Sequence, residues 1–164
     1  MNYYYTLEEY FFSEAVPNAS VLNQALRQIY AEYEAAYLET AQSVKSGSND
    51  FLNTPFSLLK ILSLSYVGED YVSLRINNVS YYGGANPDSY CDGITLNCET
   101  GELVTPSQIT GISDTELLQE ISSAMGLSGA AGWDDLDFYL TDTEIVFFYR
   151  VPNFWEEVRL PRQA

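Results

Sequence analysis

The chain has 164 residues, of which 46% are hydrophobic, and this excludes an intrinsically disordered chain and predicts one domain, residues 1–164, with a buried core. A net charge of −16, from 23 acids and 7 bases, argues against nucleic acid as a partner, because phosphate binding needs clustered lysine and arginine. A cationic protein or calcium suits such a surface, although acidity can also serve solubility alone.

No apolar run reaches the roughly 20 residues of a membrane span, so no membrane-spanning segment is expected in this chain. The start, MNYYYTLEEY, lacks the basic and apolar regions of a signal peptide. Either the protein is cytosolic, or the chain is a trimmed piece of an exported protein.

The first elements are a short strand and a long helix. Residues 3–12, YYYTLEEYFF, are rich in strand-forming residues. From Ser20 the apolar residues recur with helical period, which predicts an amphipathic helix over residues 19–45 that covers a sheet. Its apolar face comprises Leu22, Leu26, Ile29, Tyr33, Tyr37, Ala41 and Val44.

Three hairpins follow. The segments ILSLSYV and YVSLRIN alternate around the turn GED, which predicts an antiparallel pair with one solvent-exposed face. The segments GITLN and ELVT flank the break CETG, where Gly101 is free to take positive φ. The segments LDFYL and IVFFYRV, joined by TDTE, predict the third hairpin, and EVRL predicts a last strand.

A second, shorter helix is predicted in SDTELLQEISSAMG, with Ser113 and Glu116 as a capping box and Gly126 past its end. Strands and helices without strict alternation predict an α+β fold. We therefore expect an antiparallel sheet of hairpins packed against the long N-terminal helix and this shorter helix.

The two cysteines, Cys91 and Cys98, lie seven residues apart, which places them on opposite faces of an unbroken strand. A turn at Asp92-Gly93 would allow a disulfide, but two buried thiols are the favoured interpretation.

Catalysis by a Ser–His or Cys–His pair is excluded because the chain has no histidine. Two-carboxylate chemistry at Asp134, Asp135 and Asp137 is the remaining enzymatic hypothesis, and a calcium ion at the same loop is a second possibility. These acids flank turns, where aspartate is common for backbone reasons. We therefore predict a non-enzymatic protein without metal or cofactor.

The stretch VSYYGGANPDSY, residues 79–90, predicts either a corner that ends a strand or a platform for a ligand or partner. Two glycines allow another chain to come close, and the aromatic pair in RVPNFWEE offers further contact area. The predicted partner-binding residues are Tyr81, Tyr82, Gly83, Gly84, Asn86, Phe154 and Trp155.

Three blocks, YYGGAN, LNCETGEL and FYLTDTEIVFFY, carry a resemblance over residues 57–161, with Asn86 at a position where the motif has histidine. The region resembles the extracytoplasmic C-terminal domain of RsiV-type anti-sigma factors, which also accompanies peptidoglycan polysaccharide deacetylases. This resemblance implies an α+β domain of the bacterial cell envelope, with its signal or anchor elsewhere in the full-length protein. It also implies a partner such as lysozyme or peptidoglycan.

The leading hypothesis is thus a non-enzymatic, extracytoplasmic binding or sensor module. The alternatives are a carboxylate-based hydrolase and a purely structural domain of a larger envelope protein.

Overall fold

The computed structural model describes residues 3–46, 56–81, 86–124, 126, 136–151 and 154–162. Along the chain the elements are β1 (Tyr3–Glu8), α1 (Ala19–Ser46), β2 (Phe56–Val67), β3 (Tyr71–Tyr81), β4 (Asp88–Asn97), α2 (Pro106–Thr110), α3 (Asp114–Ala124), β5 (Leu136–Leu140), β6 (Glu144–Val151) and β7 (Phe154–Pro161). None of these described helices is both long and apolar enough to cross a membrane.

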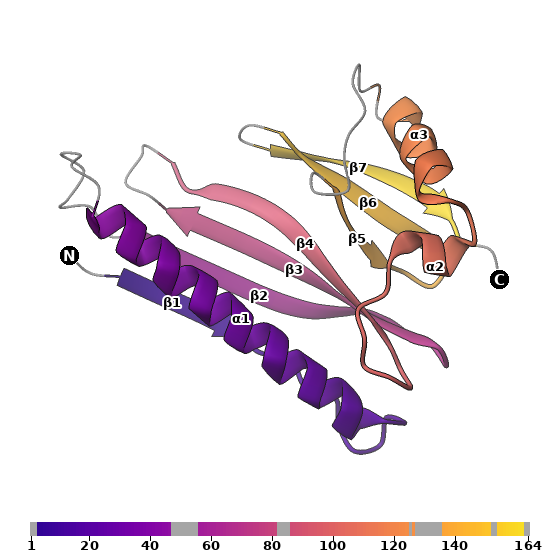
Figure 1. Ribbon diagram of the computed structural model, residues 1–164, viewed down its shortest axis with the longest axis horizontal. Coiled ribbons are helices and arrows are strands. Elements are labelled where there is room, and N and C mark those ends of the chain that lie inside the picture. The colour runs from indigo at the N-terminus through magenta and orange to yellow at the C-terminus, as the bar shows by residue number, and fades with distance from the viewer. Residues whose placement is uncertain are drawn as a thin grey trace.

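The first sheet has the strand order β1-β2-β3-β4, and α1 lies along it (Figure 1). Strands β2, β3 and β4 are antiparallel, whereas β1 pairs with β2 in parallel. The reason is the long helix between β1 and β2, which returns the chain to the end of the sheet from which β1 started. The sequence predicted hairpins and not this parallel edge.

The predicted helix over residues 19–45 is confirmed, and it packs on the sheet through its apolar face. Leu22 and Leu26 are fully buried against Val72, Leu74 and Ile76 of β3. Burying each of these leucines contributes roughly 1.5–3 kcal/mol and helps to hold the helix on the sheet.

The second sheet, β5-β6-β7, is antiparallel and lies between the first sheet and α3. Four consecutive residues of β6, Ile145 to Phe148, are buried, so both faces of this strand are covered. Ile145 and Phe147 pack against α3, while Val146 and Phe148 pack with Cys91 of β4. The predicted α+β class is confirmed, with its strands divided between two sheets.

The expected solvent-exposed face of the hairpin formed by β2 and β3 is wrong at Ser73, which is fully buried. Its hydroxyl lies 2.9 Å from Thr95 Oγ1 and accepts a hydrogen bond from the backbone N–H of Leu140 at 2.9 Å. Strand β5 therefore covers this face, and small polar side chains let two backbones approach there.

The break at CETG is a turn, as predicted, with Gly101 at φ 72°. The second strand expected after it is wrong, because the pairing there is an isolated bridge between Leu96 and Leu103. The chain instead enters α2, which the sequence did not predict, although Thr105, Pro106 and Gln108 form a helix-starting pattern.

Ser113 caps α3 as predicted, and we expect Ser113→Ala to lower the free energy of unfolding by about 1 kcal/mol. Its hydroxyl donates to Glu116 Oε2 at 2.7 Å and accepts from the backbone N–H of Glu116 at 3.4 Å. Urea unfolding checks this expectation. Ser123→Ala, an exposed serine of the same helix, is the control and should change the stability little. Equal effects of the two substitutions would contradict a capping role.

Candidate functional site: a buried lysine–carboxylate cluster and an acidic surface

The predicted partner-binding residues come from both sheets. Tyr81 ends β3, is half-buried and pairs with Ser57, and Asn86 is exposed just before β4. These two residues thus flank one connection. Phe154 and Trp155 begin β7 of the other sheet, opposite Val151 and Arg150 of β6. Tyr82, Gly83 and Gly84, together with the side chains of Phe154 and Trp155, lie outside the described residues, so this surface stays a prediction.

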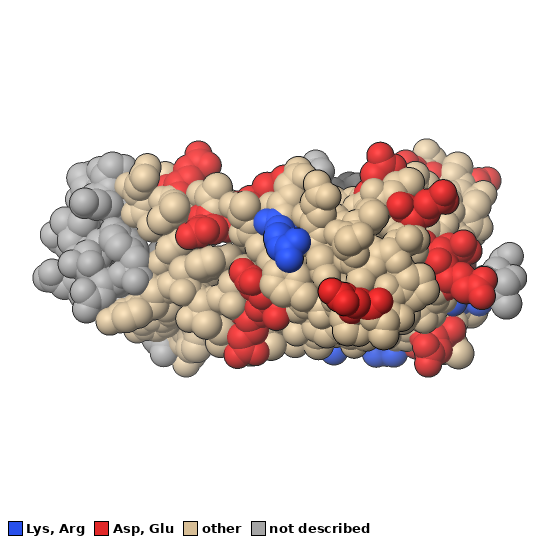
Figure 2. Space-filling model, turned by 90° about the horizontal axis from the view of Figure 1, so that it is seen from below, with Lys and Arg blue, Asp and Glu red and all other residues tan. Residues whose placement is uncertain are grey.

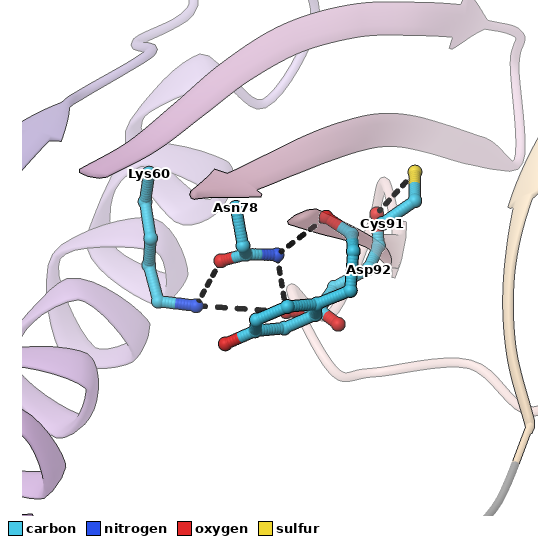
Figure 3. Close-up of polar contacts among 5 residues, drawn as sticks. Lys60, Asn78, Cys91 and Asp92 are labelled. Carbon is cyan, nitrogen blue, oxygen red and sulfur yellow. Dashed lines mark hydrogen bonds and ion pairs between the residues drawn. The ribbon is translucent and has the colours of Figure 1, made fainter. Parts of the chain in front are cut away.

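A buried lysine lies on the face of the first sheet that α1 covers. Lys60 of β2 donates to Asn78 Oδ1 of β3 at 2.5 Å, and its ammonium lies 3.5 Å from Asp92 Oδ2 of β4 (Figure 3). Asn78 in turn donates to Asp92 Oδ2 at 2.8 Å. Three neighbouring strands therefore each contribute one side chain to a closed polar network.

Aromatic rings complete the surroundings of this lysine. The ammonium of Lys60 lies 4.3 Å from the centre of the Tyr33 ring on α1 and 6.0 Å from that of Tyr90. Burial lowers the pKa of Lys60, and the charge of Asp92 opposes that shift. Helix α1 thus covers the ammonium of Lys60, whose charge is compensated by Asp92 of the same sheet.

Asp137 of β5 lies beside this cluster. Its Oδ1 accepts a hydrogen bond from the backbone N–H of Phe138 at 2.8 Å, and the backbone of Gly93 also donates to the carboxyl. Burial, followed by the charge of Asp92, raises the pKa of Asp137 to about 7. A proton on this carboxyl removes a repulsion between two neighbouring acids.

A raised carboxyl pKa is also what a general acid requires. In this chain Asp137 is half-buried, and its carboxyl accepts hydrogen bonds from the backbone of Phe138 and Gly93. Asp134 and Asp135, the other members of the predicted acidic group, lie outside the described residues. Within the described part of the chain, no group of three or more Cys, Asp or Glu side chains could hold a metal ion.

The two cysteines are free and buried, which confirms the favoured interpretation. Cys91 belongs to the core between the sheets and Cys98 to the core under α1. Arg75 Nε donates to Cys91 Sγ at 3.3 Å, yet burial is the larger influence and raises the pKa of this thiol. A protonated, buried thiol is a poor nucleophile.

The basic side chains that the structure describes are engaged within the chain. Arg159, for example, pairs with two glutamates at 3.0 and 2.9 Å. The internal partners are the Phe11 ring for Arg27, Asp92 for Lys60, Cys91 for Arg75, Glu144 and Glu157 for Arg159, and Tyr66 for Arg162. Of these five bases only Arg27 and Arg159 are exposed, so few exposed positive groups offset the acids.

Most described acidic side chains are exposed. Figure 2 shows acidic side chains along the described length of one face, with far fewer basic atoms among them. The exposed acids are Glu8, Glu9, Glu14, Glu32, Glu34, Glu39, Glu69, Asp70, Glu99, Glu102, Asp114, Glu116, Glu120, Asp142 and Glu156. They give the surface a negative potential that attracts cations over several ångströms.

A groove of about 430 Å³ lies between the first turns of α1 and the turn after β4. Val21, Ala25 and Ile29 of the helix form one side, and Leu103 forms the other. Figure 1 shows this turn beside the N-terminal half of α1. The groove joins an apolar lining to acidic rims, so it is the described cavity that best suits a partner of opposite charge.

Sequence reasoning named Asp137 but missed Lys60, Asn78 and Asp92. The segment SLLKILSL could have indicated the lysine. Lys60 lies two residues before Leu62 in this strand, so the two side chains share the face that points into the core. A charge in the apolar phase of a strand indicates a buried partner. The identity of that partner depends on the register of three strands, which alternation does not give.

No protein-family profile matches the sequence, and no curated protein is significantly similar to it. A solved structure of a DUF3298 family member from Bacteroides fragilis NCTC 9343 is similar, with 18% identity, a TM-score of 0.46, and coverage of 88% of this chain and 71% of that one. A DUF3298 family protein from Pseudomonas aeruginosa PAO1 is similar with 12% identity, a TM-score of 0.44, and coverage of 65% and 58%. The link to RsiV-type domains stays a prediction.

Proposed function

We propose that this chain is a non-enzymatic, extracytoplasmic binding module whose partner is a cationic protein. The observation that carries the proposal is the imbalance of its exposed charges: fifteen of the described acids are exposed, whereas among the bases with described burial only Arg27 and Arg159 are exposed. A complementary basic surface would approach quickly and in a preferred orientation.

The extracytoplasmic location and the choice of lysozyme as a candidate partner rest on the sequence resemblance. The predicted contact residues include Asn86, which is exposed, and Trp155 at the start of β7. An aromatic anchor at the centre of a contact commonly contributes more than its neighbours.

Calorimetry of this chain with lysozyme tests the proposal, with succinylated lysozyme, whose lysine charges are reversed, as the matched control. We expect binding that survives at about 150 mM salt, disappears with the succinylated protein, and weakens at least about tenfold in Trp155→Ala. Binding confined to about 10 mM salt would mean charge attraction without a specific site and would contradict the proposal. Binding of peptidoglycan fragments alone would replace the cationic partner by a wall glycan.

The alternatives are a carboxylate-based hydrolase and a structural domain of a larger envelope protein. The half-buried, backbone-bonded carboxyl of Asp137 favours a structural role for that acid over a catalytic one. Loss of a defined hydrolytic activity in Asp137→Asn, with the fold intact, would favour the enzyme.

A further inference from the structure

We propose that the groove between α1 and the turn after β4 receives one basic side chain of the cationic partner, preferably an arginine. This inference rests on the proposed function and says which residues of this chain contact the cationic partner. Three features of the groove support it: the chemistry of its lining, its preformed turn wall, and the absence of lysine and arginine from its described lining.

The lining of the groove has the two parts that an arginine side chain needs. Val21, Ala25 and Ile29 are half-buried and offer an apolar wall to the aliphatic stem. The carboxylates of Glu32 and Glu102 stand at the rim, where they can accept hydrogen bonds from the guanidinium. A basic side chain with an apolar stem and a charged head matches this arrangement.

Leu103 is the second observation that points to a partner at this place. Its side chain is 64% exposed, although its backbone is fixed by the bridge to Leu96. A large apolar side chain that faces both water and a groove gains from being covered. A stem lying between Leu103 and the helix would cover it.

The wall formed by the turn is preformed. Asn97 Oδ1 accepts hydrogen bonds from the backbone N–H groups of Glu99 and Thr100, each at 2.9 Å, and Asn97 O accepts one from Gly101 at 2.9 Å. A Cβ at Gly101 would come within 2.9 Å of Val21 Cγ1, so the turn packs closely on the helix. Because the turn is already fixed, binding at the groove orders few residues of this chain, and the entropic cost of binding is therefore small.

The volume and charge of the groove agree with one occupant of this kind. About 430 Å³ falls in the range of sites that take a small molecule, and it is too small for a folded element. No lysine or arginine is among the described residues that line it. Glu32 Oε1 accepts a hydrogen bond from Gln28 Nε2 at 3.1 Å, and Glu102 Oε2 accepts one from Thr100 Oγ1 at 3.4 Å. Each carboxylate keeps its other oxygen for a cation from outside.

Two-dimensional NMR of the full chain tests the inference with the peptide acetyl-Ala-Arg-Ala-amide and its neutral citrulline analogue. We expect the arginine peptide to shift amides between Val21 and Ile29 and between Thr100 and Leu103, and the citrulline peptide to bind about three- to tenfold more weakly. The double variant Glu32→Gln/Glu102→Gln should lose affinity by a similar factor. Glu39→Gln/Glu120→Gln carries the same change in net charge at exposed acids outside the groove and should lose less than twofold.

Shifts spread over the whole acidic surface, with equal losses in both double variants, would overturn the groove as a site and leave the proposed function standing. Absence of any peptide effect in a chain that binds lysozyme would overturn it too. Failure of both the peptide and lysozyme to bind would remove the proposed function as well, so the two failures are distinguishable.

Discussion

Gly93→Ala is expected to lower the free energy of unfolding by at least about 3 kcal/mol, because strand β5 passes directly over this residue. A Cβ at Gly93 would lie 1.7 Å from the carbonyl oxygen of Phe138 and 2.5 Å from its carbonyl carbon. Both atoms are backbone, so no side-chain rotation can make room. The two sheets would have to separate where Ser73 and Leu140 are hydrogen-bonded.

Urea unfolding of wild type and variant measures this effect, and thermal unfolding should show a midpoint lower by roughly 6–12 °C. Gly111→Ala is the matched control, because a Cβ at Gly111 would meet nothing within 4 Å. Its positive φ of 69° predicts a smaller cost of about 1 kcal/mol. Equal losses in the two variants would show that the close approach of β5 to β4 is wrong.

The elements that local pattern determines could be predicted from the sequence. The period of the apolar residues predicted α1 to within a residue at its C-terminal end, and the capping residue Ser113 marked the start of α3. Alternation around GED and TDTE identified the pairs β2–β3 and β5–β6. In each case the deciding contacts lie within one element or one turn.

The division into two sheets depends on contacts between distant residues. Ser73 is polar and was assigned to solvent by alternation, yet Leu140, 67 residues later, covers it. The parallel edge strand β1 likewise depends on the path of the chain around α1. Local periodicity carries no information about which face a later strand will cover.

The candidate site, like the division into two sheets, depends on contacts between distant residues. Asp137 was found as one of several acids near a turn, but its raised pKa arises from burial and from Asp92, which belongs to another sheet. The groove joins Val21 to Leu103, and the exposure of that leucine follows from a turn that ends in one bridge. Neither arrangement can be predicted from the sequence without knowing how the strands pair and in which register.

Asp137→Asn is expected to make the protein more stable than wild type at pH 8, by about 2–4 kcal/mol, and to change its stability little at pH 4. The carboxyl has a pKa of about 7 in the folded protein against 3.8 as its ordinary value. Between these two values the folded state holds a proton that the unfolded state has lost. The stability of the wild type therefore falls as the pH rises from about 4 to about 7, and the loss is complete above that window.

The asparagine removes this dependence because it does not titrate, while its amide oxygen can still accept from the backbone N–H of Phe138. Free energies of unfolding at several pH values between 4 and 8 measure the difference. Asp137→Ala is the control, and its free energy of unfolding should also lose the dependence on pH. It should be less stable than Asp137→Asn at every pH, because the backbone donors of Phe138 and Gly93 lose their acceptor. An unchanged slope in both variants would mean that Asp137 is ionised in the folded protein, and the carboxyl would then be a charged partner of Lys60 and not a neutral neighbour of Asp92.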